Sequence, residues 1–461
     1  MVQKTSLACF KSYDIRGKIP EELDEELAYQ IGYAYAHVIK PSSVIIGHDV
    51  RLESIPLAMQ LEKGLLECGV DVVNIGLCGT EEVYFHVFDK ENEGVGGGIM
   101  VTASHNPKGY NGMKMVKVGS RPMSWDNDLK KIHDYIVENR NDSSPYIQQH
   151  LGEKKVIKDK SKYISHLASY IDMKKLKPLK IVVNGGNSPA CLVIKLLEEI
   201  LPFEFIYMNE EPDGHFPNGV PNPMIVENRV TTSQKVIESK ADFGVAWDGD
   251  FDRCFLFDQR GRFIEGYYIV GLLAKAFLEK NQGGRVIHDP RLIWNSIDII
   301  ESLGGKAVQS KSGHSFIKEK MRLEEAIYGG EMSAHHYFKD FAYCDSGMIP
   351  WLLVTELLST SGAELSELVD NMIKKYPCSG EINYKVDDAD KTISKVEEYF
   401  KGQGGSFDYT DGVSVEFPKW RFNIRKSNTE PLIRLNLETR SEEISIAEKV
   451  SEIKGIIGLY H

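Results

Sequence analysis

The sequence predicts an α/β protein made of three related α/β units and a smaller α+β domain at the C-terminal end. Three observations lead to this prediction. Strand-like runs that end in turn signals occur at residues 44–47, 180–185 and 285–289. Each is followed by a helix-compatible stretch and a second short run, at residues 70–77, 203–208 and 306–309. Each unit closes in a loop rich in polar side chains, at residues 102–107, 248–253 and 330–336. Strands that alternate with helices are typical of parallel or mixed sheets.

Polar, helix-poor stretches predict the boundaries between these parts. The first linker is expected at 139–162, the second boundary just after Arg253, and the third near 376–380. From residue 381 onward, a helical run (393–402) is mixed with alternating strands such as 413–417, which favours an α+β domain. We therefore expect four domains, at residues 1–150, 155–255, 256–370 and 375–461.

Composition narrows the class of protein. A chain of 461 residues is too long for one hydrophobic core. Its net charge of −12 argues against a general binder of nucleic acids or anionic membranes. The seven cysteines are scattered and form no C-x-x-C pair, which favours a reducing compartment over a disulfide framework or a structural zinc site. No apolar run is long enough to span a bilayer and the N-terminal residues lack a signal-peptide core, so we expect a cytoplasmic protein.

Ser104 has the most informative setting in the chain. A β-branched run ends abruptly in the turn dipeptides Asn106-Pro107 and Asn111-Gly112, so the serine is expected on a loop at a strand end. His105 lies beside it and Lys114 just beyond. A serine displayed with a base and an ammonium nearby is a candidate nucleophile or phosphoryl carrier. The alternative is a polar hairpin whose serine only satisfies the backbone.

An acidic triplet follows the buried run 243–247. Asp248, Asp250 and Asp252 alternate along the chain, so their carboxylates are able to converge on one hard cation such as Mg²⁺. An EF-hand is the obvious competitor, but its sixth position is Arg253 instead of Gly and its twelfth is Gln259 instead of Glu. The remaining alternative is an acidic surface turn. Arg253 would offer a fork of donors to a phosphoryl oxygen.

Two further loops carry polar chemistry. Residues 425–429 (Arg-Lys-Ser-Asn-Thr) lie between two strand-like runs and offer consecutive donors to a dianion, although a plain polar loop explains them equally well. Glu331 and Ser333 on a glycine-opened loop match the acceptor and donor that a vicinal diol of a sugar needs. The adjacent His335 and His336 lack a carboxylate or cysteine partner at useful spacing, which favours partly buried histidines on a turn over metal ligands.

Together these segments resemble the α-D-phosphohexomutase family, and the resemblance spans essentially the whole chain. It is carried by four motifs in the family's order: Thr102–Pro107, Asp248–Arg253, Gly330–Ser333 and Arg425–Thr429. The segments Asp289-Pro-Arg291-Leu and Glu331 through Gly347 are most similar to bacterial phosphomannomutases of the type that feeds GDP-mannose and exopolysaccharide synthesis. The resemblance implies four domains around a central active-site cleft.

It also implies a set of roles. Ser104 would carry a phosphoryl group, and Asp248, Asp250 and Asp252 would hold Mg²⁺ together with the Ser104 oxygen. The catalytic set would be completed by Arg253 and Arg16 at the phosphoserine, with His105 and Lys114 as proton-transfer groups. Glu331, Ser333 and His335 would bind the sugar. The distal phosphate would be held by Arg425, Ser427, Asn428 and Thr429, aided by Arg291 and His314. Relatives of dual specificity often have Gly after Glu-Met-Ser, whereas this chain has Ala334.

The implied activity is a phosphomannomutase that interconverts mannose 6-phosphate and mannose 1-phosphate through a hexose 1,6-bisphosphate. The bisphosphate would also serve as activator, and the protein is expected to be a monomer or a weak dimer. Phosphoglucomutase or dual activity is the nearest alternative, because contacts to O3 and O4 do not distinguish sugars that differ at C2. A Mg²⁺-dependent sugar phosphatase and a non-catalytic sugar-phosphate-binding module are the alternatives from other classes.

Overall fold

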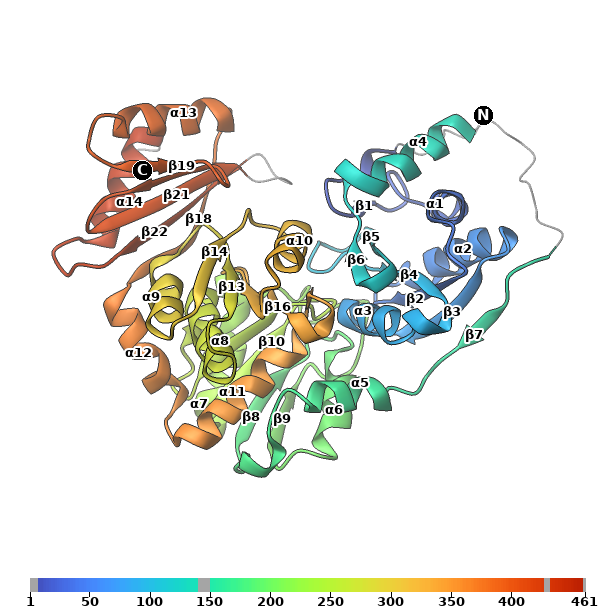
Figure 1. The fold of residues 1–461 in the computed structure, drawn as a ribbon, viewed down its shortest axis with the longest axis horizontal. Coiled ribbons are helices and arrows are strands. Elements are labelled where there is room, and N and C mark those ends of the chain that lie inside the picture. The colour runs from blue at the N-terminus through green and yellow to red at the C-terminus, as the bar shows by residue number, and fades with distance from the viewer. Residues whose placement is uncertain (1–6, 140–149, 427–431, 459–461) are drawn as a thin grey trace. The chain divides into compact units, whose positions relative to one another are not determined.

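The computed structural model describes residues 7–139, 150–426 and 432–458. The chain divides into two compact units. The first consists of Met1–Phe263 and His335–Gly362, and the second of Ile264–Ala334 and Ala363–His461. Figure 1 follows the chain through both units from blue to red.

The first unit begins with a seven-stranded mixed sheet of order β1-β5-β4-β2-β3-β7, in which β6 pairs with β5. Its strands are β1 (Ile15–Lys18), β2 (Ser43–His48), β3 (Asp71–Leu77), β4 (Val95–Val101), β5 (Tyr110–Lys117), β6 (Arg121–Pro122) and β7 (Lys154–Val156). β2 pairs in parallel with β3 and β4, whereas β5 pairs antiparallel with β4, β1 and β6. The helices of this part are α1 (Glu25–Ile39), α2 (Ser54–Glu67), α3 (Thr80–Asp89) and α4 (Lys130–Asn139). Helix α1 buries Leu27, Ile31 and Tyr35, the spacing of an amphipathic helix whose apolar stripe faces the core.

The second sheet has five strands in the order β12-β11-β10-β8-β9. Its strands are β8 (Lys180–Asn184), β9 (Glu204–Met208), β10 (Phe243–Trp247), β11 (Cys254–Asp258) and β12 (Phe263–Ile264). The helices here are α5 (Ser161–Ala168), α6 (Ala190–Glu198) and α7 (Val230–Ser239). Strand β11 pairs antiparallel with β10, from Cys254 opposite Trp247 to Asp258 opposite Phe243. The sheet therefore continues past Arg253, where we expected a boundary, because the aspartate loop is the turn of a hairpin.

The strands between the second sheet and the C-terminal part are divided between the two units. β13 (Arg285–His288) pairs in parallel with β14 (Lys306–Gln309) and β15 (Tyr328–Gly330) in the second unit. Helices α8 (Gly266–Lys280), α9 (Trp294–Ser302), α10 (His314–Glu324) and α12 (Leu365–Lys375) belong to the same unit. The first unit is completed by β16 (His336–Phe338), β17 (Cys344–Asp345) and helix α11 (Met348–Ser361).

The C-terminal part is an all-antiparallel sheet of order β18-β22-β21-β20-β19. Its elements are β18 (Cys378–Lys385), α13 (Ala389–Phe400), β19 (Ser406–Asp408), β20 (Val413–Glu416), β21 (Trp420–Lys426), β22 (Leu432–Thr439) and α14 (Ile446–Ile457). Its core joins Phe400 of α13 and Ile453 of α14 to Phe422 and Leu435 of the sheet. Helix α13 begins four residues before the predicted run, because the Asp388 side chain caps it by accepting from the Lys391 N–H at 2.9 Å.

The internal repeat predicted from the sequence is confirmed in the topology. The strand orders β4-β2-β3, β10-β8-β9 and β15-β13-β14 are the same, with the first-entered strand in the middle each time. In all three cases the polar loop follows the third strand, at its carboxyl end. The fold class, three α/β parts and a C-terminal α+β part, is thus the predicted one.

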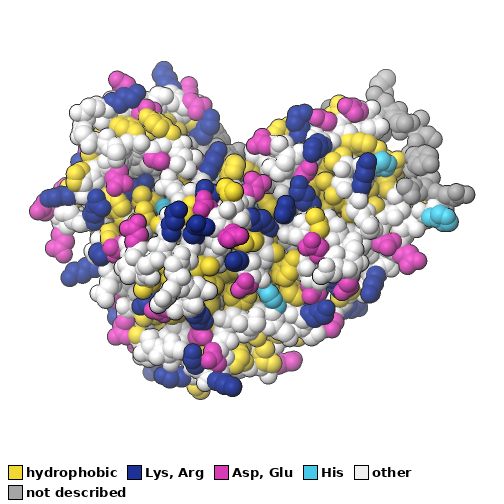
Figure 2. All heavy atoms as spheres, in the orientation of Figure 1, with side chains coloured by type: hydrophobic (Ala, Val, Ile, Leu, Met, Phe, Trp, Pro, Cys, Tyr) yellow, Lys and Arg dark blue, Asp and Glu magenta, His cyan; other side chains and the backbone are white. Residues whose placement is uncertain are grey.

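The surface carries charges of both signs. On the face shown in Figure 2, Lys and Arg are interspersed with Asp and Glu, as a chain with 55 basic and 67 acidic residues requires. Within the described ranges, no helix has both the length and the apolar character needed to cross a bilayer.

One buried carboxylate connects three helices of the first unit. Glu81 on α3 accepts hydrogen bonds from the Tyr163 hydroxyl on α5 (2.6 Å) and the Ser346 hydroxyl (2.8 Å). It also accepts from the backbone N–H groups of Gly347 (2.6 Å) and Met348 (3.1 Å), where α11 begins. A carboxylate is favoured there, because the first N–H groups of a helix have no partners within the helix.

Replacing Glu81 with Ala should strip these four buried donors of their acceptor. Each unsatisfied buried donor costs about 1–3 kcal/mol, so we expect the unfolding free energy to fall by roughly 4 kcal/mol. Denaturant titration of the purified variant measures this loss. Glu93→Ala is the control, since Glu93 is exposed and pairs only with Lys90 on the surface, and it should leave the midpoint unchanged. An equally stable Glu81→Ala variant would refute the role of this carboxylate.

Candidate active site

Ser104 lies on the loop between β4 and β5 with a left-handed backbone conformation (φ +50°). The Thr102 hydroxyl fixes this turn by accepting from the Ser104 N–H at 2.9 Å. The residue is only 2 % exposed. Its hydroxyl is therefore buried, whereas the sequence suggested a hydroxyl displayed to solvent. Ser104 Oγ instead donates to Asp248 Oδ2 at 2.8 Å and lies 3.0 Å from His105 Nδ1. A non-glycine residue in this conformation is strained, and such strain is typical of functional sites.

Arg51 holds the Ser104 loop in place, and sequence reasoning missed it. Its buried guanidinium donates to the backbone carbonyls of Ser104 (2.9 Å), Asn106 (2.5 Å), Pro107 (3.0 Å) and Tyr110 (3.0 Å). Four carbonyls on one side chain fix the course of the whole loop, since each is a separate charge-assisted hydrogen bond.

A signal for Arg51 was present in the sequence. Strand β2 ends at His48, where the sequence His48-Asp-Val-Arg51 begins. Strand β13, its equivalent in the third α/β part, ends at His288, where the sequence His288-Asp-Pro-Arg291 begins. In both, the histidine Nδ1 lies 2.9 Å from the carbonyl oxygen of the following aspartate. A four-residue pattern repeated at equivalent strand ends would have indicated that Arg51 and Arg291 have similar positions.

The aspartate loop joins β10 to β11 and lies against the Ser104 loop. The carboxylates of Asp248, Asp250 and Asp252 are buried, and one oxygen from each falls within 4.8 Å of the others. Each has an Oδ1 atom that is buried and has no hydrogen-bond partner among the described residues. Three buried oxygens without donors fit a hard divalent cation, which binds carboxylate oxygens. The residues therefore suit the metal that the aspartate pattern predicts.

A close backbone approach between the two loops requires glycine at position 249. A Cβ atom on Gly249 would lie 2.3 Å from the carbonyl oxygen of Ser104. The aspartate loop is tied down on its other side as well, because Thr80 donates to Asp250 Oδ2 at 2.5 Å and its N–H donates to the Asp250 carbonyl at 3.0 Å. The Ser104 hydroxyl and the carboxylates are thus fixed relative to each other by backbone contacts.

Lys114 on β5 supplies positive charge to the aspartates. Its Nζ donates to Asp250 Oδ2 at 2.6 Å and to Asp252 Oδ2 at 2.5 Å. Burial alone would lower the pKa of Lys114, but these carboxylates raise it above its usual range. Burial would likewise raise the pKa of Asp250, and Lys114 holds it below its usual range. Burial and the neighbouring Asp252 and Asp250 raise the pKa of Asp248 to about 7.

His105 and two arginines surround the Ser104 hydroxyl. Burial, together with the charges of Arg253 and Arg16, holds the pKa of the His105 imidazole well below its usual range, so the ring is neutral at pH 7. Arg253 Nε lies 3.6 Å from Asp248 Oδ2. Arg16 on β1 donates to Asn106 Oδ1 at 2.7 Å and to Asp14 Oδ2 at 2.5 Å. The first unit therefore contains all five predicted catalytic residues and all four predicted metal ligands, Ser104 being in both sets.

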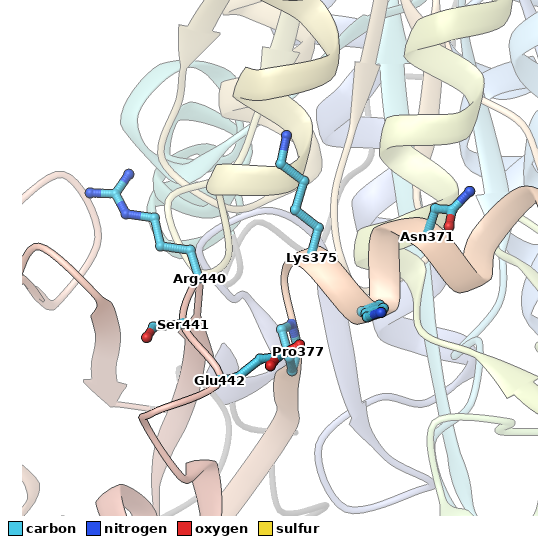
Figure 3. A pocket seen from close by; sticks show the side chains of 7 residues that line it. Asn371, Lys375, Pro377, Arg440, Ser441 and Glu442 are labelled. Atoms are coloured by element: carbon cyan, nitrogen blue, oxygen red, sulfur yellow. The ribbon is translucent and has the colours of Figure 1, made fainter.

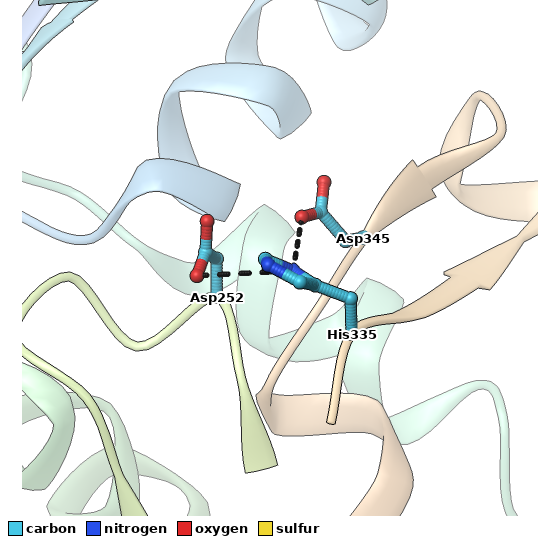
Figure 4. A group of neighbouring side chains, drawn as sticks. All are labelled: Asp252, His335 and Asp345. Atoms are coloured by element: carbon cyan, nitrogen blue, oxygen red, sulfur yellow. Dashed lines mark ion pairs between the residues drawn. The ribbon is translucent and has the colours of Figure 1, made fainter. Parts of the chain in front are cut away.

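His335 also belongs to this unit, between two carboxylates that are remote in sequence (Figure 4). Its Nδ1 lies 2.9 Å from Asp345 Oδ2 and 3.9 Å from Asp252 Oδ1. The sequence offered no carboxylate at useful spacing, but the fold provides two. Burial lowers the pKa of the adjacent His336 to about 3, so this histidine is neutral at pH 7. His336 is fully buried in β16, whereas we expected a partly buried histidine on a turn.

The second unit brings Glu331 and Ser333, two of the three predicted sugar-binding residues, together around Arg291. Arg291 donates to both oxygens of Asp289 (3.0 and 2.9 Å), to Glu331 Oε1 (3.4 Å) and to Ser333 Oγ (3.2 Å). The Gly313 N–H, immediately before His314 at the start of α10, donates to the same Glu331 oxygen at 2.9 Å. Ala334 has φ +68°, a backbone conformation that favours glycine, so a Gly would fit this position without strain.

Glu381 lies among three arginines of the second unit, and sequence reasoning missed this too. It lies 3.6 Å from Arg291, 3.3 Å from Arg425 and 3.1 Å from Arg434. Burial would raise the pKa of Glu381, but the three guanidinium groups hold it below its usual range. Glu381 thereby brings Arg425 close to Arg291. The predicted phosphate ligands Ser427, Asn428 and Thr429 lie outside the described residues.

A separate hollow of about 330 Å³ in the second unit contains none of the predicted site residues. Its lining includes Lys374, Lys375, Arg440 and Glu442, and Figure 3 shows the Lys375 and Arg440 side chains extending from separate elements. Lys375 pairs with Asp298 at 2.6 Å, so this carboxylate neutralises part of the lysine's charge.

Comparisons with known proteins match one protein family over nearly the whole chain. Models of the phosphoglucomutase/phosphomannomutase α/β/α domains I, II and III match residues 8–142, 161–261 and 265–376, and the C-terminal domain model matches 381–453. The phosphohexose mutases of Xanthomonas campestris pv. campestris are 54% identical over 453 residues, 98% of this chain and 99% of theirs. The phosphomannomutase of Escherichia coli is 53% identical over 441 residues, 95% of this chain and 96% of its own. A crystal structure of a phosphoglucomutase/phosphomannomutase family protein from Burkholderia thailandensis has a TM-score of 0.87 at 29% identity, covering 99% of both chains.

Substituting Gly249 with Ala tests the loop contact. The added Cβ would push the aspartate loop away from Ser104, so we expect at least about a tenfold loss of Mn²⁺ affinity, or about 1.4 kcal/mol. Isothermal titration calorimetry with MnCl₂ measures this change. Gly455→Ala is the matched control, because no atom lies within 4 Å of its added Cβ on helix α14, and it should bind Mn²⁺ normally. Normal Mn²⁺ affinity in Gly249→Ala would refute the contact's role.

Proposed function

Because the chain belongs to the phosphoglucomutase/phosphomannomutase family, we propose that it is a phosphomannomutase that interconverts mannose 6-phosphate and mannose 1-phosphate. The observation that carries this proposal is Ser104 Oγ, held 2.8 Å from Asp248 in a buried centre of three aspartates. A buried serine beside three carboxylates has no evident structural need, but it suits a stored phosphoryl group that must be kept from water.

Ser104 carries the phosphoryl group in this mechanism. A free hydroxyl of the bound hexose monophosphate attacks the phosphorus, and the bond between phosphorus and Ser104 Oγ breaks. The product of this half-reaction is a hexose 1,6-bisphosphate. After the sugar reverses its orientation, Ser104 Oγ attacks the other phosphoryl group and releases the isomeric monophosphate. The phosphoserine is thus restored, and no phosphate is lost to water.

The surrounding groups support this chemistry. The neutral His105 imidazole, 3.0 Å from Ser104 Oγ, holds or moves the proton at that oxygen. Lys114 is the second proton-transfer group. Arg253 and Arg16 offset charge on the phosphoryl oxygens. Asp248, Asp250 and Asp252 would hold Mg²⁺, which supplies charge neutralisation to phosphoryl transfer when bound.

The second unit supplies substrate recognition in this proposal. Glu331, Ser333 and His335 bind sugar hydroxyls, although His335 lies in the first unit. Arg291, His314 and Arg425 bind the distal phosphate together with Ser427, Asn428 and Thr429. Support comes from Glu381, whose carboxylate lies 3.6 Å from Arg291 and 3.3 Å from Arg425 and so brings these two cationic side chains together. The four domain ranges expected from the sequence correspond to these roles in order: phosphoserine, metal, sugar and phosphate.

We place the enzyme in the cytoplasm. All seven cysteines are free thiols in the structure, and six of them are buried. Free thiols suit a reducing compartment. Mannose and glucose phosphates are the substrate class, and a hexose 1,6-bisphosphate is the activator that would phosphorylate Ser104.

The proposal predicts a phosphoserine at position 104. Intact-mass and peptide mass spectrometry of fresh enzyme should find one phosphoryl group on the Ser104 peptide, and Ser104→Ala should lower the turnover of mannose 1-phosphate by at least about 10³-fold. Ser169→Ala, on an exposed helix end, is the control and should retain full activity. Release of inorganic phosphate as fast as sugar is consumed would instead identify a phosphatase.

Substrate preference is a separate prediction. Each 1-phosphate is supplied with a trace of glucose 1,6-bisphosphate, and the 6-phosphate formed is measured by ³¹P NMR. We expect kcat/KM for mannose 1-phosphate to exceed that for glucose 1-phosphate by roughly tenfold, because one hydroxyl configuration discriminates modestly. Equal values would identify a dual-specificity enzyme, an alternative favoured by the similarity to the phosphohexose mutases of Xanthomonas.

A further inference from the structure

A second group of metal-binding side chains adjoins the three aspartates. Asp252, from the loop between β10 and β11, faces His335, which immediately precedes β16, and Asp345 on β17. Their residues are 2 %, 8 % and 1 % exposed. One possible ligand atom from each lies within 4.8 Å of the other two, and Figure 4 shows the imidazole between the two carboxylates.

A proton on the His335 imidazole does not provide a hydrogen bond for every polar atom of this group. A hydrogen shared by His335 Nδ1 and Asp345 Oδ2, 2.9 Å apart, leaves Asp252 Oδ1 as a buried oxygen with no hydrogen-bond partner in the described ranges. Lys114 donates to the other oxygen of Asp252, and Arg253 Nε is 4.0 Å from Oδ1, beyond hydrogen-bonding distance. A buried carboxylate oxygen thus faces an imidazole nitrogen 3.9 Å away.

The distances suit a cation bound between these atoms. A tetrahedral ion with ligands at 2.0–2.2 Å holds its ligand atoms roughly 3.4 Å apart. The two distances from His335 Nδ1, 2.9 and 3.9 Å, fall on either side of this value, so small side-chain rotations would reach it.

The local charge also leaves room for a second cation. Four carboxylates, those of Asp248, Asp250, Asp252 and Asp345, lie close together, and within the described ranges Lys114 and Arg253 form ion pairs with the aspartate loop. One divalent ion at the three aspartates offsets that excess, and a phosphoryl group on Ser104 brings back nearly two negative charges. This last step rests on the proposed function, whereas the ligand geometry does not.

We propose that Asp252, His335 and Asp345 bind a second divalent cation of the class that accepts nitrogen ligands, such as Zn²⁺ or Co²⁺. An imidazole with two carboxylates favours these ions over Mg²⁺, which prefers oxygen ligands only. The site shares Asp252 with the three aspartates. A cation there would bind Nδ1 of His335, a residue that we also assign to substrate binding.

Metal-free full-length protein titrated with CoCl₂ tests the proposal. Calorimetry should give two equivalents for the wild type, and visible absorption should show the intense bands of four-coordinate Co²⁺ with a nitrogen ligand. His335→Asn and Asp345→Asn should each bind one equivalent and lose those bands. Asp250→Asn, which alters only the three-aspartate group, should also bind one equivalent but keep them.

His133→Asn is the matched control, because His133 Nδ1 lies 3.0 Å from Asp134 Oδ1 and, within the described part of the chain, this pair belongs to no three-residue group suited to a metal. This variant should bind two equivalents. A single equivalent in the wild type would overturn the proposal even if a variant failed to fold, and so would two equivalents in folded His335→Asn. No mutase assay enters the test, so failure of the proposed function would leave its outcome unaffected.

Discussion

The backbone contact between the Ser104 loop and the aspartate loop is the constraint on which the rest of the first unit depends. Gly249 leaves room for the Ser104 carbonyl, and this places the serine hydroxyl within hydrogen-bonding distance of Asp248. Two loops more than 140 residues apart in the chain are thereby held in one arrangement. Arg51 fixes one loop through four carbonyls and Thr80 fixes the other, so the reacting groups are preorganised before any ligand binds.

This contact concentrates charge in a place from which water is largely excluded. Three buried carboxylates face one lysine, and the resulting pKa shifts have opposite directions, upward for Asp248 and downward for Asp250. Burial strengthens each pairwise interaction, because the local dielectric constant is far below that of water. A cation bound by Asp248, Asp250 and Asp252 would offset the negative charge of this buried group.

The repeated topology explains why the functional loops have equivalent positions. In open α/β sheets, loops at the carboxyl ends of the strands form the binding crevice. Here the strand order places one polar loop after β4, β10 and β15 in turn. The same repeat places Arg51 and Arg291 at equivalent strand ends, and each anchors the polar loop beside it. One structural solution therefore anchors two loops: the loop of Ser104 and the loop of Glu331 and Ser333.

The sequence by itself determined the fold class, the three repeated α/β parts, the strand before each functional loop, and the identity of Ser104 and the aspartates. These features are local, because strand periodicity, turn dipeptides and alternating carboxylates are written in consecutive residues. Only the tertiary structure decided that Ser104 is buried, that β11 continues the second sheet past Arg253, and that Arg51, Glu81, Asp345 and Glu381 have the partners they do. Most of these depend on groups far apart in the chain, whose distance is set by sheet order and backbone packing. Asp345 is an exception, since it lies beside His335 through the pairing of β16 with β17. Local patterns predict which chemistry is present, whereas long-range packing decides which charges face one another.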